Sequence, residues 1–197
     1  MATPRPTDLT GPLVSSLEIP GDFIVRQHIS VTTPQMNGDF EAIIQSYCGE
    51  LTIIGFSPLG LKLFSVRQSG QDLEIDALQL NGWSFSPDRI LLDVHRIYFY
   101  PIAQPSLEDG QHVLRFGTDP LRERWSEGRL TERSIPMEDE QGEQWLEIRY
   151  KETKHAIPIL NSRWDSRDIS LRNPLYEYEL GIRTVSYQAL SCEADRD

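Results

Sequence analysis

The sequence feature that most limits the fold is a series of short segments in which apolar and polar residues alternate. In the first segment, Phe23, Val25, Ile29 and Val31 all fall at odd-numbered positions. This period of two is typical of a strand with one buried face. Turn signals at residues 37–39, 48–50 and 69–71 separate predicted strands at residues 22–31, 40–47, 51–56, 61–67 and 72–77. Five strands joined by short turns predict an antiparallel meander.

A helix is predicted after these strands, over residues 87–100. Ser86, Pro87 and Asp88 supply an N-cap, a first-turn proline and an acidic first turn. Apolar residues then recur at helical spacing at positions 90, 91, 94, 97 and 98. This spacing predicts an amphipathic helix that buries one face.

The second half of the chain predicts further short strands. They are expected at residues 112–116, 121–126, 130–135, 145–150, 157–160 and 176–183, with a solvated hairpin loop at 138–143. The total is about 9–11 strands, and because wide sheets twist and curl, a flat sheet is not expected. We predict a mainly β fold: a curved antiparallel sheet or incomplete, half-open β-barrel, covered by the helix. The expected organisation is a flexible Pro-rich lead (1–20), a single β domain (21–190) and a disordered tail (191–197).

Charge and composition exclude several function classes. The net charge of -11 argues against a nucleic-acid partner, because phosphate binding requires an excess of Lys and Arg. Acidic residues lie among the local arginines, so these are interpreted as a solvated strand face of mixed charge; they are Arg115, Arg122, Arg124, Arg129 and Arg133. No run of apolar residues approaches the length of a membrane span.

Catalytic and metal-binding motifs are not found in the sequence. The four histidines, His28, His95, His112 and His155, have no partners at metal-ligand spacing and are interpreted as ordinary solvated or hydrogen-bonded side chains. No nucleophile elbow, phosphate-binding loop or zinc-protease motif is present. We therefore predict a non-enzymatic protein without a metal or cofactor. The tryptophans, Trp83, Trp125, Trp145 and Trp164, are expected to fill core or strand-pair positions.

The two cysteines do not settle the redox environment. Cys48 and Cys192 are 144 positions apart, and they can pair only if the fold returns the tail to the second strand. The simplest interpretation of Cys48, which follows an apolar strand, is a small buried hydrophobe.

The turn Ser57-Pro58-Leu59-Gly60 carries a leucine where polar residues are usual. Since turns lie on the surface, Leu59 either folds back onto the sheet or is exposed to contact something else. The sequence leaves both possibilities open.

Two resemblances involve this turn and its surroundings. Residues 51–64, followed by residues 70–75 and a capped helix, resemble the lipoprotein-receptor family of the bacterial outer membrane and the LolA/LolB carrier and receptor fold. Residues 122–130 and 178–184 resemble an uncharacterised group of proteobacterial outer-membrane lipoproteins, often associated with aryl-polyene biosynthesis clusters. This second likeness covers roughly residues 38–187.

The resemblance implies an apolar cavity that holds acyl chains. It also implies an outer-membrane anchor outside these 197 residues, and a turn residue, matched by Leu59, that assists delivery of lipid cargo. Ligand contacts are expected at the apolar face, the helix and the turn tip: Leu51, Ile53, Leu59, Leu63, Leu73, Ile75, Leu91, Val94 and Tyr98.

The leading hypothesis is a periplasmic or outer-membrane lipoprotein domain that binds or transfers an acyl chain, a lipoprotein or a polyene-like lipid. Its location is the periplasmic face of the outer membrane if a lipoprotein signal precedes the chain, and cytoplasmic otherwise. One alternative is a structural or interaction protein with a solidly packed barrel and a protein partner. Another is an enzyme acting on a lipid or polyketide intermediate.

Overall fold

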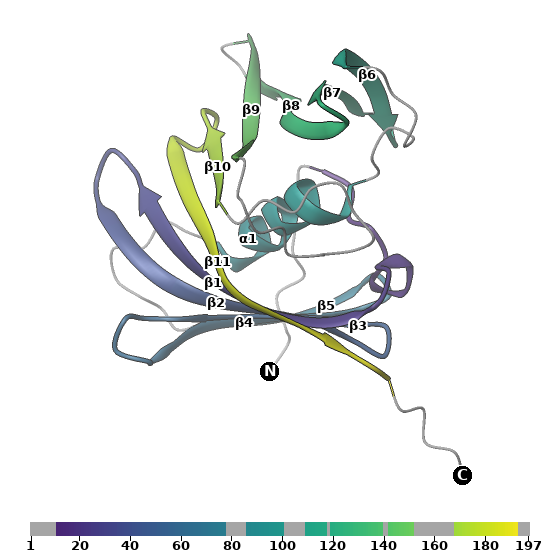
Figure 1. The fold of residues 1–197 in the computed structure, drawn as a ribbon. Helices are drawn as coiled ribbons and strands as arrows, with labels where there is room; N and C mark the ends of the chain where they lie inside the picture. Colours follow the sequence, from purple (N-terminus) through teal and green to yellow (C-terminus); the bar gives the residue numbers. More distant parts are fainter. Residues whose placement is uncertain are drawn as a thin grey trace. The chain divides into compact units, whose positions relative to one another are not determined.

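A computed structural model describes residues 11–77, 86–100, 109–117, 119–139, 142–151 and 168–192 (Figure 1). Its strands are β1 (Asp22–Thr32), β2 (Asn37–Tyr47), β3 (Glu50–Phe56), β4 (Lys62–Ser69), β5 (Asp72–Ala77), β6 (Gly110–Phe116), β7 (Asp119–Ser126), β8 (Arg129–Asp139), β9 (Gly142–Lys151), β10 (Asp168–Asn173) and β11 (Tyr178–Leu190).

The strands form one open antiparallel sheet, which confirms the mainly β prediction. Their order is β5-β4-β3-β2-β1-β11-β10-β9-β8-β7-β6. Two meanders of sequence neighbours are therefore joined where β1 pairs with β11. The chain also divides into two compact units, residues 1–27, 40–100 and 185–197 (unit 1) and residues 28–39 and 101–184 (unit 2). Strands β1, β2 and β11 contribute residues to both units.

The strands of unit 1 show the alternating burial that the sequence predicts. On β3, Leu51 and Ile53 are fully buried while Thr52 and Ile54 are half-buried. Inward-facing residues on β1 and β2 include Phe23, Val25, Phe40 and Ala42. All five predicted strands of the first meander are confirmed.

The first turn lies earlier than predicted. Residues 37–39 belong to β2 and do not form the turn. The turn is made instead by Thr33, whose backbone N–H donates to the Met36 carbonyl at 2.9 Å, while its Oγ1 accepts the Met36 N–H at 3.0 Å. Because Thr33 completes the turn with its own side chain, Asn37 and Gly38 can begin the next strand.

The helix occupies residues 87–99, as α1 (Pro87–Val94) followed by a π-helical turn, η2 (His95–Phe99). Its predicted extent is confirmed to within one residue. Ser86 stands at the N-cap position, but its hydroxyl bonds the Asp88 carboxylate and caps no backbone N–H. The expected polar face is also buried, since Asp93, His95 and Arg96 are at most 3% exposed. The helix is therefore enclosed and not simply amphipathic.

The second half of the chain confirms five predicted strands, as β6, β7, β8, β9 and β11, and corrects three details. Residues 138 and 139 extend β8 and residues 142 and 143 begin β9, so the predicted loop at 138–143 was too long. Tyr176 lies in the turn before β11 and not in a strand. Strand β10 was missed, because its six residues offer only Ile169 and Leu171 as a pattern. The predicted strand at 157–160 lies outside the described residues.

The two cysteines form a disulfide, with their Cα atoms 5.3 Å apart. Cys48 is exposed and has a positive φ of 50° in the β2–β3 turn, so its interpretation as a buried hydrophobe was wrong. The Asp22 carboxylate accepts the backbone N–H groups of Cys48 and Cys192, each at 2.8 Å. The end of β11 is thus fastened to the β2–β3 turn within unit 1.

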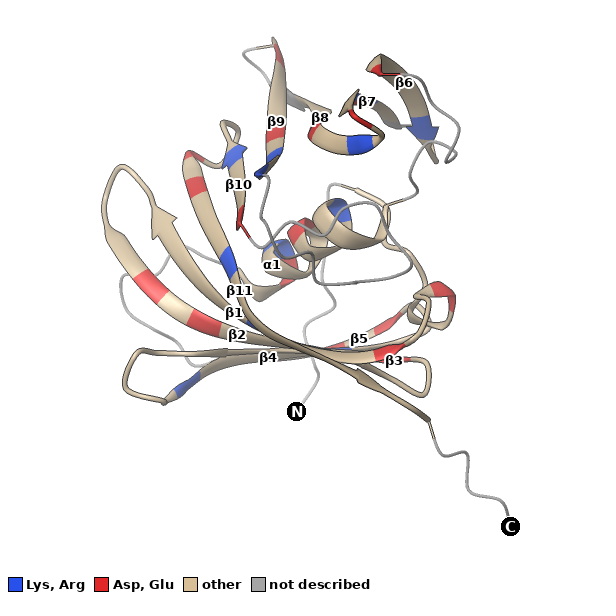
Figure 2. Cartoon of the chain, in the orientation of Figure 1, with Lys and Arg blue, Asp and Glu red and all other residues tan. Residues whose placement is uncertain are grey.

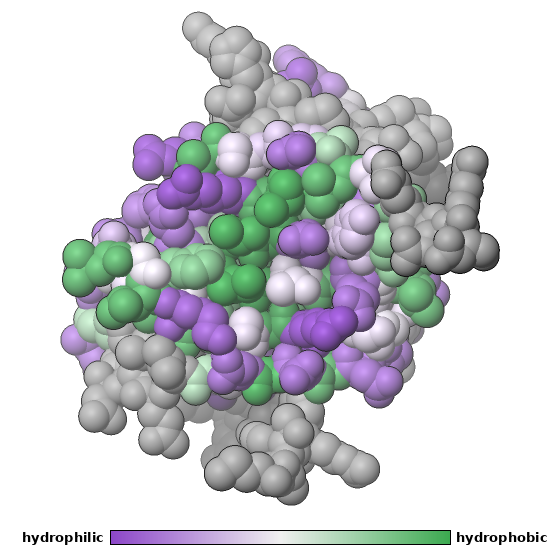
Figure 3. Space-filling view, turned by 90° about the horizontal axis from the view of Figure 1, so that it is seen from below, coloured by the Kyte–Doolittle hydropathy of each residue, from purple (hydrophilic) through white to green (hydrophobic). Residues whose placement is uncertain are grey.

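Charged residues of both signs are spread over the strands (Figure 2). The outer face of the unit 1 strands carries ion pairs such as Arg26–Glu41 and Arg67–Glu50, at 2.5 and 2.7 Å. Apolar side chains also gather on this face (Figure 3), where Ile43 on β2 is opposite Ile54 on β3. Of the helices in the described part of the chain, none has the length and apolar character needed to cross a membrane.

Candidate functional site

The buried face of the unit 1 sheet, which we call the covered face, is built from cross-strand rows of side chains, most of them apolar. Register places Ile44, Ile53, Val66 and Ile75 opposite one another across four neighbouring strands. Directly opposed residues of antiparallel strands point to the same face, so these side chains form one continuous row. A second row contains Ser46, Leu51, Gln68 and Leu73.

The predicted site residues divide into three groups. Leu51, Ile53, Leu73 and Ile75 lie in these rows, the last two half-buried on β5. Leu91, Val94 and Tyr98 are buried in the helix above them. Leu63 is buried but lies at the irregularity opposite Gly55 and Phe56, outside the two rows.

Polar side chains fasten the helix to the covered face at His95. The His95 Nδ1 accepts the Val14 N–H at 3.2 Å, so the other ring nitrogen carries the proton and donates to Gln68 Oε1 at 2.8 Å. The Gln68 amide donates in turn to the Val14 carbonyl at 2.9 Å. Burial lowers the pKa of His95 to about 3, so the ring is neutral at neutral pH. We call Val14, Gln68 and His95 the neutral triad.

A second polar contact joins the helix to β1. The Gln27 amide donates to the Tyr98 hydroxyl at 2.6 Å, and both side chains are buried. Burial raises the pKa of Tyr98, with a smaller opposing contribution from the Gln27 hydrogen bond, so the phenol stays protonated. The ring of Phe23 on β1 also lies 6.5 Å from that of Phe99.

A segment at residues 11–16, which we call the strap, runs from the helix to the β4–β5 turn and ends at the first residue of the short 3-10 helix η1 (Ser16–Glu18). The Tyr100 hydroxyl donates to the Pro12 carbonyl at 2.8 Å. At the other end, the Ser16 N–H donates to the Gly70 carbonyl at 3.1 Å, and Ser16 Oγ accepts the Gly70 N–H at 2.7 Å. The strap therefore contacts both the helix and the strands that the helix covers.

The residues of these polar contacts were missed by the sequence reasoning, although a signal was available. Gln27 follows Phe23 and Val25 at the next inward position of β1, and Gln68 follows Phe64 and Val66 in the same way on β4. A glutamine at an inward strand position must find a hydrogen-bond partner in the core. The alternation of inward and outward positions along each strand could therefore have identified Gln27 and Gln68 as buried hydrogen-bonding residues.

The turn that carries Leu59 is exposed and well fixed. Leu59 is 88% exposed and Leu61 is 65% exposed. The Ser57 N–H donates to the Leu61 carbonyl at 2.8 Å, and the Gly60 N–H donates to the Ser57 carbonyl at 2.8 Å. Gly60 has a positive φ of 79°, which a glycine adopts without strain. Of the two possibilities left open by the sequence, the structure shows the exposed one.

Unit 2 contains a buried ion pair, which corrects the interpretation of the arginines as a wholly solvated face. Arg133 donates from Nε and Nη2 to Glu123 Oε1 at 3.0 and 2.6 Å, and both side chains are 0% exposed. The Trp125 indole N–H donates to the other carboxylate oxygen at 3.1 Å. We call these three residues the charged cluster. Arg122 and Arg124 are exposed as expected, and Arg122 lies over the Trp145 ring at 3.8 Å.

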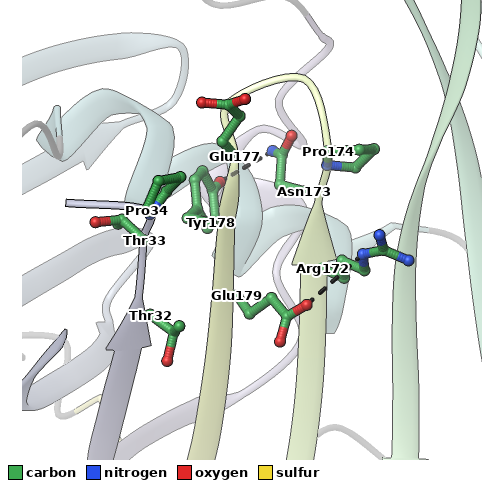
Figure 4. A pocket seen from close by; sticks show the side chains of 9 residues that line it. All are labelled: Thr32, Thr33, Pro34, Arg172, Asn173, Pro174, Glu177, Tyr178 and Glu179. Carbon is green, nitrogen blue, oxygen red and sulfur yellow. Dashed lines mark hydrogen bonds and ion pairs between the residues drawn. The ribbon is translucent and has the colours of Figure 1, made fainter. Parts of the chain in front are cut away.

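Two open pockets of about 440 and 450 Å³ lie on described residues of unit 2. The first is bounded by the β1–β2 and β10–β11 turns, where Asn173 donates to the Tyr178 hydroxyl at 3.0 Å (Figure 4). Arg172 and Glu179, 3.6 Å apart, border both pockets. Their linings combine polar and apolar surface and include charged side chains, unlike the two rows of the covered face. Within the described ranges no group of three or more His, Cys, Asp or Glu side chains is arranged to hold a metal ion.

Comparisons with known proteins identify a family and a fold. Residues 24–186 match the model of the family described as "Protein of unknown function (DUF3261)". No curated protein matches the chain. A LolA superfamily protein from Nitrosomonas europaea is similar in structure, with a TM-score of 0.52 and 13% identity over 89% of this chain and 90% of that chain. This likeness shows a LolA-like fold.

A second similar structure is described as an outer membrane lipoprotein-sorting protein domain from Vibrio parahaemolyticus. It has a TM-score of 0.48 and 9% identity, over 89% of this chain and 88% of that chain.

Proposed function

This chain belongs to the DUF3261 family, and we propose that it is a lipoprotein-carrier-like domain that binds the apolar part of a lipid-like ligand on its covered face. The proposal assigns a binding role and no catalytic one. The observation that carries it is the pair of cross-strand rows beneath a single helix, within a LolA-like fold.

The helix and an acyl chain would gain similar burial free energies on the covered face. Five apolar helix residues are buried, namely Ile90, Leu91, Leu92, Val94 and Ile97. At about 2 kcal/mol each, their burial contributes about 10 kcal/mol. An acyl chain with about 12 buried methylenes gains a similar amount, at about 0.8 kcal/mol per CH₂. Because these contributions nearly cancel, an acyl or polyene-like chain can replace the helix if the polar contacts that hold the helix are also released.

The exposed turn supports a role in transfer. Leu59 and Leu61 are large apolar side chains on a turn fixed by Ser57, where a polar tip would be expected of a turn that contacts only water. We propose that this turn contacts the lipid surface or the acylated cargo when the ligand is exchanged.

The disulfide supports an oxidising compartment, because such bonds persist outside the cytoplasm and are rare within it. We therefore propose a periplasmic location, at the outer membrane, for the binding activity. An acylated lipoprotein and a polyene-like lipid both have the apolar chain that the covered face would accept.

A second candidate function is a structural or interaction protein whose interior is filled by its own side chains. The complete burial of Leu51, Ile53, Val66 and Leu91, each 0% exposed, favours it. In this case the helix stays in place and the partner is a protein that contacts the outer surface.

Titration with dansyl-undecanoic acid distinguishes the two functions. Saturable binding, together with copurified lipid in native mass spectrometry, is expected of a carrier. Ile75→Arg, on the covered face, should weaken binding at least tenfold. Glu74→Arg, on the opposite face of the same strand, is the matched control and should leave binding unchanged. If the probe binds neither the wild type, nor the control, nor a variant in which the strap has been loosened, the carrier function is wrong and the structural function is favoured.

A further inference from the structure

The strap is held in an unusual way, because the side chains that hold it bind its main chain. The Val14 N–H, the Val14 carbonyl and the Pro12 carbonyl each bond a side chain from the helix or from β4: His95, Gln68 and Tyr100 respectively. Main-chain groups are the same in every residue, so these three hydrogen bonds recognise the backbone of the strap and do not by themselves select its side chains. We call the surface formed by Gln68, His95 and Tyr100 the seam.

The strap also blocks movement of the helix sterically. A Cβ atom added at Gly11 would lie 3.3 Å from Leu92 Cδ1 and 3.4 Å from Arg96 Nη2, so the strap backbone runs directly against the helix. Its other end is fastened to the β4–β5 turn by the Ser16 bonds to Gly70. The helix thus lies between the covered face and the strap, and its polar residues Asp93, His95 and Arg96 are as buried as its apolar ones.

We propose that the seam is a binding site for an extended polypeptide backbone, that residues 11–16 fill it as a latch, and that displacement of this latch frees the helix from the covered face. The inference rests on the proposed function only for what the covered face then binds. A competing extended segment, such as the polypeptide part of an acylated cargo, would open the domain by taking the place of the strap in the seam.

The π-helical turn fits this role. The latch bonds to His95, the first residue of the turn η2 (His95–Phe99), and to Tyr100, the residue directly after it. A π-helical turn is a less stable arrangement than continuous α-helix and is frequent at functional sites. The part of the helix that the latch holds is therefore the part with the weakest backbone structure of its own.

Two substitutions loosen the latch at separate points. Val14→Pro removes the N–H donor to His95, and Tyr100→Phe removes the hydroxyl donor to Pro12 while keeping the ring. Each loses one hydrogen bond, so hydrogen exchange of the helix amides at residues 90–99 should accelerate by roughly fivefold. Ser30→Ala, which removes a hydroxyl bond to the Gly181 carbonyl in unit 2, is the matched control and should leave helix exchange unchanged.

A covalent link between the strap and the helix should have the opposite effect and slow the exchange of the helix amides. In a Gly11→Cys/Leu92→Cys variant, a short bifunctional thiol reagent applied with the native disulfide intact should slow helix exchange at least tenfold. A synthetic peptide of residues 9–18 should bind Val14→Pro protein at least tenfold more tightly than wild type. If the amides of residues 11–16 exchange faster in both loosened variants while those of the helix do not, the latch is overturned.

The hydrogen-exchange result does not depend on any ligand. If the loosened variants free the helix but dansyl-undecanoic acid still fails to bind, the latch stands and the carrier function fails. If the probe binds wild-type and cross-linked protein at the same rate, the carrier function stands and the latch fails.

Discussion

The neutral triad of unit 1 and the charged cluster of unit 2 are two different kinds of buried polar group, although unit 1 also buries the Asp93–Arg96 ion pair of its helix, at 3.4 Å. The neutral triad of unit 1 joins residues from the strap, β4 and the helix, separated by up to 81 positions, and contains no charge. The charged cluster of unit 2 joins residues of two neighbouring strands, at most ten positions apart, and contains a full ion pair. The first connects separate elements, whereas the second stiffens a single hairpin.

This difference indicates which of the two contacts is the easier to break. A buried ion pair is strongly held once formed, because removing either partner leaves an unpaired charge away from water. A neutral network is lost at a smaller cost, since each amide, imidazole and backbone group can bond water instead. The neutral triad is therefore suited to a reversible contact, and the charged cluster to a permanent one.

The largest expected effect comes from breaking the charged cluster. Glu123→Leu leaves the Arg133 guanidinium buried without its carboxylate, and should lower the free energy of unfolding by about 3–5 kcal/mol. Chemical denaturation followed by tryptophan fluorescence measures this. The double variant Glu123→Leu/Arg133→Met removes both charges and should recover most of the loss. A loss below about 1 kcal/mol for the single variant would contradict a permanent role for the cluster.

Acid should destabilise the neutral triad selectively. The pKa of His95 is about 3 in the folded chain and about 6.5 when unfolded, so below pH 6.5 the unfolded state binds the proton more tightly. The stability contributed by the neutral ring is thus complete above pH 6.5 and is lost as the pH falls toward 3. At pH 5 the loss should be about 2 kcal/mol relative to pH 7.5. Denaturation at both pH values should show a smaller loss in His95→Gln.

A smaller effect is expected at the contact between Tyr98 and Gln27, which is also neutral. Tyr98→Phe removes the hydroxyl but keeps the ring, and should lower the free energy of unfolding by about 1 kcal/mol. A double-mutant cycle with Gln27→Leu measures how much of this loss belongs to the pair. If the coupling free energy of Tyr98 and Gln27 is as large as that of Glu123 and Arg133, the neutral and the charged contacts do not differ in strength.

The smallest effect on stability is expected at Leu59. Since this residue is 88% exposed, Leu59→Asp should change the free energy of unfolding by no more than about 0.5 kcal/mol. Leu63→Asp, on the next strand but only 6% exposed, should cost several times more and serves as the reference. Leu59→Asp should nevertheless reduce binding to phospholipid vesicles in a flotation assay. Unchanged vesicle binding would show that the turn does not contact lipid.

The alternation of apolar and polar residues correctly predicted which side chains of the first five strands face the core. The parity that places Ile53 and Ile75 on the covered face can be read within a single strand, because side chains alternate with a period of two. The same parity places Glu123 with Leu121 and Trp125, and Arg133 with Ile135, so the charged cluster could have been recognised as buried. Interpreting every arginine as solvated was the error.

Long-range contacts could not be read in this way. The Val14 bond to His95 spans 81 positions, and the Cys48–Cys192 disulfide spans 144. Both depend on the return of the chain ends to the meander, which alternation does not encode.

The pairing of β1 with β11 has a consequence for how the protein is made. Each meander pairs sequence neighbours and can assemble while the chain is still being synthesised. The β1–β11 pairing and the disulfide must wait until all eleven strands have been synthesised. Until then β1 presents an unpaired edge, and Cys48 is a free thiol in search of its partner. The last step of assembly is therefore the one in which an exposed strand edge is most open to incorrect pairing.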